Sequence, residues 1–258
     1  MRNVLLALVF VVLAAPALAA DGVLEVNQTC AVNTGCLSGD TAGYPVTIDG
    51  TAGRGYRLTS DLIVPNENTD GIKVSTSDIG IDLNNFAIIR SGCEGVSKDC
   101  TPVSGTGSGI EYGSSLNRGI SVKNGSITGM GSYGVLLGIQ AEVTGLRVRW
   151  NRVIGIYADA GSIVSGNTVY QNGDDGIFAS NGSTISGNTA YLNAGDRIAT
   201  SSGVTVQRNT VSFNLRYGLN LGSQSAYREN VITGNATGTV TGGTNAGANV
   251  CNGSLTCP

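Results

Sequence analysis

A repeat of 21 residues runs through the second half of this sequence. One asparagine column keeps this interval at Asn151, Asn172, Asn193, Asn214 and Asn235, and a second keeps it at Asn167, Asn188, Asn209 and Asn230. A glycine column, Gly134, Gly155, Gly176 and Gly218, has the same interval, with Arg197 in place of one glycine. Columns that stay in one register over so many residues indicate stacked copies of one structural unit.

Each repeat holds three short β-rich segments between Gly and Asn turns. Helical repeats need more residues, and the leucine-asparagine pattern of leucine-rich repeats is missing. We therefore predict an all-β fold, a parallel β-helix (solenoid) of about eight coils, stacked at about 4.8 Å. Side chains should alternate between core and solvent. The inward positions of one coil would be Ile156, Ala158, Val164 and Val169. Stacked asparagine amides at the turns should bond to one another along the axis.

The ends of the chain carry different signals. Arg2, an apolar run at 4–15 and an Ala-x-Ala site at 17–19 predict a signal peptide over residues 1–20. The protein should thus be secreted, at the cell surface or periplasmic. We expect an N-terminal cap at 21–50, the β-helix at 51–235 with an insertion at 91–107, and a C-terminal cap at 236–258.

Six cysteines fall into three sequence-local pairs. The short separations favour disulfides Cys30–Cys36, Cys93–Cys100 and Cys251–Cys257, which suit an oxidising compartment. The sequence has no histidine, which excludes Ser-His-Asp and Cys-His catalysis and His-ligated zinc. A net charge of −3 gives no indication of a nucleic-acid partner. No stretch after the signal peptide is apolar enough for membrane insertion.

The pattern of Gly155-Ile156, Val164, Asn167, Val169 and Asn172, repeated over about residues 56–235, resembles the right-handed parallel β-helix repeat proteins of the pectate-lyase-like superfamily. The resemblance implies a right-handed coil. The superfamily includes polysaccharide lyases, glycoside hydrolases, epimerases, phage tailspikes and secreted proteins of unassigned activity. A polysaccharide is therefore the expected partner, whereas the activity stays open.

Acidic residues are scarce in the repeat, and three of them precede first-strand positions. Asp174, Asp175 and Asp196, if close together, would hold Ca²⁺, which prefers oxygen ligands. Alternatively, a carboxylate pair would share acid–base work on a glycosidic bond. An Asp-Asp doublet before Gly-Ile also fits ordinary turn chemistry.

Arginines lie in the same turns. Arg152, Arg197 and Arg216 would bind the carboxylates of uronic acids. In the superfamily's lyases, Asp-bound Ca²⁺ neutralises the uronate while Arg or Lys removes a proton. By position, the resemblance extends these catalytic roles to Asp174, Asp175, Asp196, Arg197 and Arg216.

Aromatic residues recur at outward positions. Tyr157 and Phe178 share one column, and Tyr170 and Tyr191 share another with Arg149. Such pairs make flat surfaces for sugar rings, unless loops or neighbours cover them. Between residues 134 and 235 no long insertion would enclose a substrate, which favours binding over chemistry. We predict a protein that binds extracellular or cell-surface polysaccharide. The alternatives are a small lyase or hydrolase acting on an acidic polysaccharide, and a purely structural surface protein.

Overall fold

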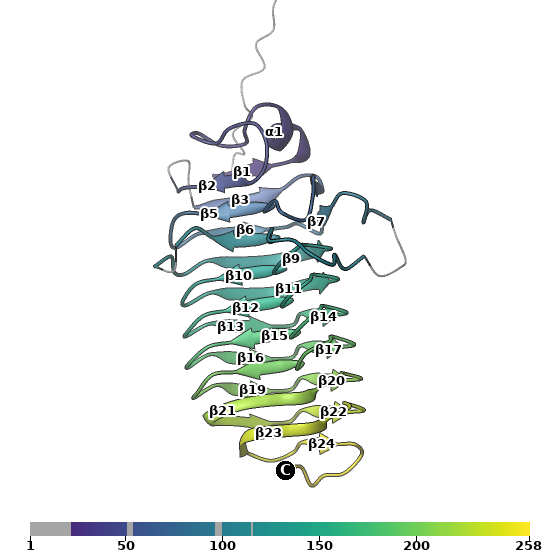
Figure 1. Cartoon of the computed structure of the whole chain (residues 1–258). Coiled ribbons are helices and arrows are strands. Elements are labelled where there is room, and N and C mark those ends of the chain that lie inside the picture. Colours follow the sequence, from purple (N-terminus) through teal and green to yellow (C-terminus); the bar gives the residue numbers. More distant parts are fainter. Residues whose placement is uncertain (1–21, 51–53, 96–99, 115) are drawn as a thin grey trace, which may run out of the picture.

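The chain winds into one long rod (Figure 1). The structure is a computed structural model and describes residues 22–50, 54–95, 100–114 and 116–258. The predicted signal peptide lies outside these residues. The described part forms a parallel β-helix of about nine coils, where the sequence predicted about eight. The predicted all-β solenoid is thus confirmed. The described residues contain no helix whose length and hydropathy would suit a membrane span.

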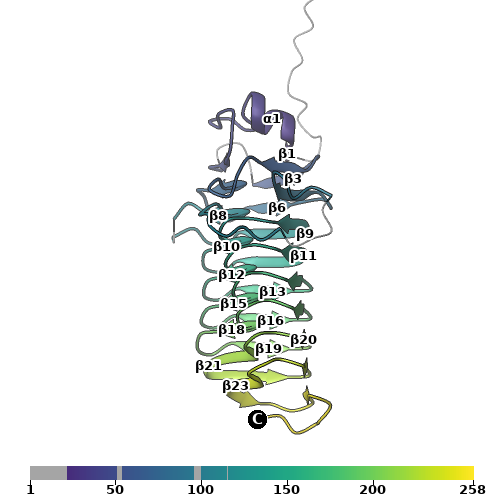
Figure 2. The ribbon, with the colours of Figure 1, turned by 45° about the vertical axis from the view of Figure 1, so that its right-hand side comes forward.

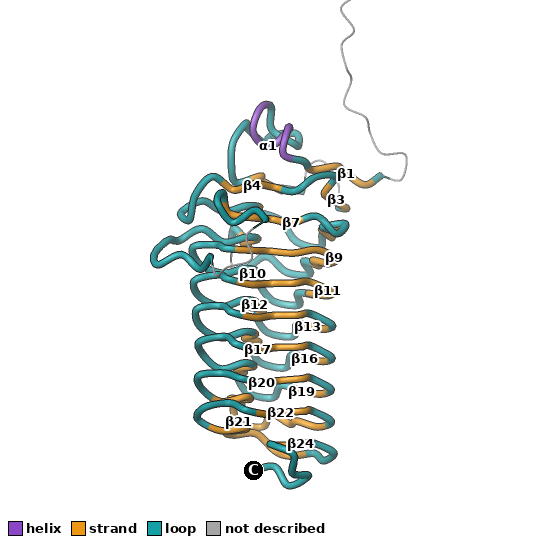
Figure 3. The backbone as a smooth tube through the Cα atoms, turned by 90° about the vertical axis from the view of Figure 1, so that its right-hand side faces the viewer, coloured by secondary structure: helices purple, strands orange, loops and turns teal. Residues whose placement is uncertain are grey.

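Three parallel ladders of strands make up the wall of the rod, and Figure 3 shows the turns stacked between them. The first ladder contains β2 (Val46–Ile48), β5 (Ile72–Val74), β8 (Ile110–Tyr112), β10 (Val135–Leu137), β12 (Ile156–Ala158), β15 (Ile177–Ala179), β18 (Ile198–Thr200), β21 (Tyr217–Arg228) and β23 (Gly238–Asn245).

The second and third ladders run beside it. The second contains β1 (Val23–Val26), β3 (Gly55–Leu58), β6 (Gly80–Asp82), β9 (Ser121–Thr128), β11 (Glu142–Arg149), β13 (Ile163–Ser165), β16 (Thr184–Ser186) and β19 (Thr205–Gln207), and continues into β21 and β23. The third contains β4 (Leu62–Val64), β7 (Ala87–Arg90), the later parts of β9 and β11, β14 (Thr168–Tyr170), β17 (Thr189–Tyr191), β20 (Thr210–Ser212), β22 (Val231–Thr233) and β24 (Val250–Cys251). Figure 2 shows the ladders in a second view.

The interior of the rod is an apolar core built from alternate strand residues. In β12, Ile156 and Ala158 are buried and Tyr157 between them is half-buried. Val164 and Val169 are also buried, as predicted. Strict stacking follows from the sequence period, because every inward position meets the same position of the next coil, 21 residues on.

Two asparagine ladders run along the corners of the rod. The side-chain amide of Asn151 donates to Oδ1 of Asn172 at 2.9 Å, and Asn172 donates to Asn193 at 2.8 Å. The second ladder has the same geometry, with donor–acceptor distances of 3.0 Å, from Asn167 through Asn188, Asn209 and Asn230 to Asn249. The predicted stacking of Asn172 on Asn193 is therefore confirmed. These buried amides satisfy polar groups that would otherwise cost free energy at each turn.

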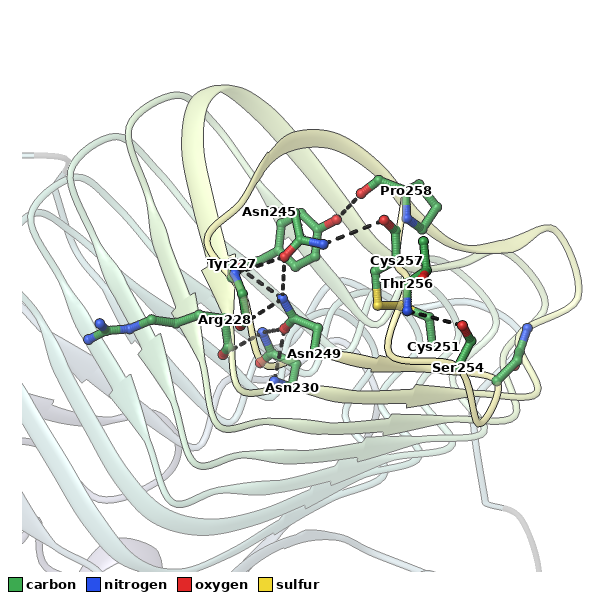
Figure 4. Close-up of a disulfide and its surroundings, with 12 residues drawn as sticks. Tyr227, Arg228, Asn230, Asn245, Asn249, Cys251, Ser254, Thr256, Cys257 and Pro258 are labelled. Atoms are coloured by element: carbon green, nitrogen blue, oxygen red, sulfur yellow. Dashed lines mark hydrogen bonds between the residues drawn. A yellow bond between two sulfur atoms is a disulfide. The ribbon is translucent and has the colours of Figure 1, made fainter.

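Both ends of the stack are covered. At the N-terminal end lies the short helix α1 (Gln28–Asn33), where Oε1 of Gln28 accepts a hydrogen bond from the backbone of Ile63. At the other end, the last residues fold over the final coils, and the Tyr227 hydroxyl donates to the carbonyl of Pro258 (Figure 4). Covered ends prevent the open strand edges from pairing with other chains.

Regular pairing extends into both predicted caps. β1 and β2 lie within residues 21–50 and pair with β3 and β5. Similarly, β23 and β24 lie within residues 236–258 and pair with β21 and β22. The part of the chain described as coiled is therefore longer than the repeat pattern alone indicated.

The three predicted disulfides are confirmed. Cys30–Cys36 joins α1 to the loop that follows it, and Cys251–Cys257 closes the C-terminal tail. Cys93–Cys100 staples the insertion, which projects from the side of the rod near β7 and β9. Arg90 fixes the base of this insertion by donating to the carbonyls of Gly129 (2.7 Å) and Cys100 (2.9 Å).

Candidate functional site

The outward column of the first ladder carries the first candidate surface. Along it, Leu136, Tyr157, Phe178, Ala199 and Asn220 stand in register. The rings of Tyr157 and Phe178 are stacked, with centroids 5.0 Å apart and planes inclined by 13°. Tyr133, in the turn before β10, contacts Tyr157 edge-on, with ring centroids 6.0 Å apart. We call these three rings the first-ladder stack.

In the first-ladder stack, one face of the Phe178 ring has no aromatic neighbour. The inner faces of Tyr157 and Phe178 are turned to each other, so these two faces are not open to a ligand. The next residue of the column is Ala199, whose side chain is a single methyl group. The face of Phe178 on that side is therefore turned toward Ala199, which is only 7% exposed, and toward the exposed Asn220 one coil further on.

The third ladder carries a separate aromatic pair. Tyr170 and Tyr191 are stacked at 4.9 Å with planes inclined by 4°. Nη1 of Arg149 donates to the Tyr170 hydroxyl at 3.0 Å, and the guanidinium of Arg149 lies 4.1 Å from the ring centre of Trp150. The structure thus places the predicted binding residues on two different ladders and does not assemble them into one surface.

Two aspartates meet in the turn before β15. The Oδ1 atoms of Asp174 and Asp175 lie 2.4 and 2.5 Å from the point where a Cβ on Gly195 would stand, so both face the same spot. Asp175 Oδ1 also accepts a hydrogen bond of 2.7 Å from the backbone N–H of Asp196. Burial raises the pKa of Asp175 to about 6, although that hydrogen bond opposes the shift. The negative charges of Asp174 and Asp196 raise it further, and Arg216 lowers it.

The carboxylate of Asp196 accepts hydrogen bonds from the next coil instead. Its Oδ1 accepts from the N–H of Tyr217 at 2.9 Å and its Oδ2 from the Asn220 amide at 2.8 Å. Both oxygens of this carboxylate thus have a donor, whereas Asp174 and Asp175 face the spot beside Gly195. Among the described residues, no group of three acidic or cysteine side chains is arranged to hold a metal. The three-aspartate Ca²⁺ site stays a prediction.

The predicted arginines have different surroundings. Nε of Arg152 donates to the carbonyl of Gly131 at 2.7 Å, and Arg216 is exposed near Asp175. Arg197 corrects the sequence analysis. We expected it in the outward turn, yet its side chain is completely buried. Arg197 occupies the position that is glycine in the neighbouring coils. A Cβ added to those glycines would point into the core, and the side chain of Arg197 does so. Arg197 is therefore unable to touch a ligand at the surface.

Several residues of this surface were missed by the sequence analysis. Tyr133 stands in the same turn column as Asp175, but only charged residues were considered in these turns. Glu111 pairs in register with Leu136 and so lies in the first-ladder column. Its pKa is raised, first by burial and then by the charge of Asp70. Insertions shift this coil out of the 21-residue spacing, which is why the pattern did not reveal it.

Comparison with known proteins identifies the fold family. Residues 108–255 match the family described as the right handed beta helix region. The chain belongs to this right-handed β-helix family. Right-handedness, which the repeat pattern alone did not fix, thus follows from membership. No curated protein matches the chain significantly.

Solved structures share the fold at low sequence identity. The A-module of mannuronan C-5 epimerase AlgE4 from Azotobacter vinelandii is 15% identical, with a TM-score of 0.57 over 84% of this chain and 62% of that one. The A-module of AlgE6 from the same organism is 16% identical, with a TM-score of 0.53 over 90% and 67%. The periplasmic alginate epimerase AlgG is 13% identical, with a TM-score of 0.54 over 88% and 58%. The chain therefore spans about three fifths of the length of AlgE4 and AlgG.

Proposed function

We propose that this protein binds an extracellular, cell-surface or periplasmic polysaccharide on the outward face of the first ladder. One sugar ring contacts the half-buried ring of Phe178 on the side that is turned toward Ala199. The observation that carries the proposal is the first-ladder stack, which ends at a residue with a one-carbon side chain. Half-buried aromatic rings of this kind bind the apolar faces of sugars.

Charged groups at the same level favour an acidic polymer. Arg216 is exposed and close enough to Asp175 to affect its pKa. Its guanidinium is suited to pairing with a sugar carboxylate. Three proteins of similar structure are mannuronan or alginate epimerases, and this makes alginate the first polymer to test. The three disulfides support a location outside the reducing cytoplasm.

A second candidate function is catalysis on the same polymer. Asp175 has a pKa raised to about 6, and the Asp174 carboxylate faces the same point beside Gly195. A carboxyl group whose pKa is raised, with a second carboxylate beside it, is suited to acid–base work on a glycosidic bond or a sugar C–H. In this reading Asp175 is the acid–base group and Arg216 the carboxylate-binding group of a lyase or hydrolase.

The test is binding of alginate oligosaccharides by titration calorimetry, with neutral cello-oligosaccharides as a comparison. We expect Phe178→Ala to abolish binding and Tyr191→Ala, which shortens the other stack, to leave it unchanged. The proposal fails if wild-type protein binds no acidic polymer, or if Tyr191→Ala has the larger effect. The first of these results would leave the purely structural role.

Catalysis is tested on the same samples, with and without Ca²⁺. Unsaturated ends are measured by ultraviolet absorbance, reducing ends chemically, and epimerisation by proton NMR. Product formation that disappears in Asp175→Asn would establish the enzyme. Binding without any product would establish the binding protein.

A further inference from the structure

Arg197 is a cation buried inside the rod without a partner. Its side chain has no exposed surface, and within the described part of the chain none of its three guanidinium nitrogens has a hydrogen-bond acceptor. The nearest acidic residue in sequence, Asp196, gives both oxygens to Tyr217 and Asn220. Burial lowers the pKa of Arg197 to about 9, so the group still carries its charge at neutral pH.

The same arginine interrupts the first asparagine ladder. At Gly134, Gly155, Gly176 and Gly218, an added Cβ would stand 2.8, 2.8, 2.5 and 2.7 Å from the side-chain nitrogen of Asn151, Asn172, Asn193 and Asn235, respectively. Arg197 has a real Cβ at this position, and the corresponding amide is that of Asn214. Asn193 keeps its bond to the carbonyl of Val169, as Asn172 does to Val148, but no bond to Asn214 accompanies it, and Oδ1 of Asn214 has no partner among the described residues.

The core beside Arg197 differs in composition from that of the other coils. One inward column reads Val148, Val169, Ala190, Val211 and Ile232, so a valine is reduced to alanine in the coil before Arg197. Another inward column has the polar Thr200 after Ala158 and Ala179. The long side chain of Arg197 therefore lies in a part of the core that has one smaller and one more polar residue than the coils before it.

A surface hollow adjoins the interrupted ladder. It has a volume of about 340 Å³ and is lined by Asn193 and by the exposed apolar side chains of Leu192, Phe213 and Leu215, among others. Asn193 belongs both to the wall of this hollow and to the broken step of the ladder. Arg197 itself is not among the residues that line the hollow.

We propose that the rod binds a small inorganic anion such as chloride beside the guanidinium of Arg197, behind the broken step between Asn193 and Asn214. A buried guanidinium is stable only when its charge is compensated and its donors are satisfied. A water molecule would accept hydrogen bonds from the guanidinium but would not compensate its positive charge. A monovalent anion would accept the hydrogen bonds and compensate the charge. The side-chain nitrogen of Asn235, a buried donor without a partner among the described residues, lies one coil further along the same ladder.

The test uses bromide as the probe, because it replaces chloride and scatters anomalously. Crystals of the full chain grown in bromide should show an anomalous peak within hydrogen-bond distance of the Arg197 guanidinium. The peak should be absent in Arg197→Gly, the variant that restores the residue found in neighbouring coils. A wild-type map without a peak at Arg197 overturns the proposal.

Solution stability gives an independent measurement. Wild-type protein should have a midpoint of thermal unfolding roughly 2–4 °C higher in sodium bromide than in sodium gluconate of equal ionic strength. The matched control Arg147→Gln removes an exposed arginine and should keep this difference. Arg197→Gly and the uncharged Arg197→Met should lose it. The same salt response in all four proteins would contradict a site at Arg197, whatever the outcome of the polysaccharide experiments.

Discussion

The side-chain nitrogen of Asn188 donates to Oδ1 of Asn209 at 3.0 Å, and it also donates to the carbonyl of Val164 at 2.9 Å. Each amide thus joins its own coil to both neighbours. Asn188 in turn accepts from the backbone and the side chain of Asn167. The stability of the rod depends on such buried bonds as well as on the apolar core.

Replacing Asn188 by alanine should therefore destabilise the protein strongly. The change leaves the donors of Asn167 and the carbonyl of Val164 without partners inside the protein. We expect a loss of about 3 kcal/mol in the free energy of unfolding, measured by urea denaturation. Asn68→Ala, at an exposed site, should change it by less than about 0.5 kcal/mol. Equal effects of the two variants would show that the ladder contributes little.

Gly176→Ala tests why the glycine column exists. The new Cβ would stand 2.5 Å from Nδ2 of Asn193 and 2.8 Å from the carbonyl oxygen of Arg197. We expect a loss of about 1–3 kcal/mol in urea denaturation. Gly55→Ala is the matched control, because its Cβ would meet only Val23 at 3.6 Å. If Gly176→Ala were as stable as the control, the account of how Arg197 breaks the ladder would be wrong.

The raised pKa of Asp175 predicts an unusual dependence of stability on pH. In the folded state this group keeps its proton up to about pH 6, whereas in the unfolded chain it ionises near its ordinary pKa of 3.8. The unfolded state therefore releases the proton first, and the free energy of unfolding should fall as pH rises from about 4 to 6, by at most about 2–3 kcal/mol.

Asp175→Asn removes this dependence while it keeps an acceptor for the N–H of Asp196. The variant should gain stability over wild type at pH 7, and the difference should shrink toward pH 4. Urea titrations at four pH values would measure it, with Glu67→Gln as a carboxylate control in another turn. A constant difference between variant and wild type across this range would rule out Asp175 as the cause.

Ala199→Phe should block the proposed sugar site. A phenyl ring there follows Phe178 in the column, as Phe178 itself follows Tyr157. Because Ala199 is only 7% exposed, we expect a loss of about 1–3 kcal/mol in stability. The folded variant should lose at least about tenfold in affinity for the polymer, worth about 1.4 kcal/mol. Ser212→Phe extends the Tyr170–Tyr191 stack in the same way and should leave affinity intact. Tight binding by Ala199→Phe would exclude this site.

The fold was readable from the sequence because one period governs every column. Asn172, Asn193 and the inward valines recur at the interval that stacking imposes, so their partners follow directly. The same period misled at Arg197. Its neighbours in the column are glycines, which have no side chain to show that this position points inward. A repeat pattern therefore predicts the path of the backbone well. It predicts poorly the direction of a single side chain that departs from the pattern.

The candidate site was predictable only in part. Sequence spacing predicted that Tyr157 and Phe178 would be neighbours, but not that their faces would cover each other and leave only the side toward Ala199. The spacing also predicted that Asp196 would lie near Asp175. It did not predict that the Asp196 carboxylate would accept hydrogen bonds from Tyr217 and Asn220. Hydrogen-bond partners within turns depend on side-chain rotamers, which no repeat specifies.

The interrupted step between Asn193 and Asn214 has a mechanical consequence. Elsewhere in this region, hydrogen bonds between asparagine side chains join neighbouring coils at two corners of the rod. At this step only the hydrogen bond between Asn188 and Asn209 is present. Under tension along its length, for example while anchored to a polymer at one end, the rod should part first at this level. The last coils would then come away as a unit, with the Cys251–Cys257 tail still folded over them.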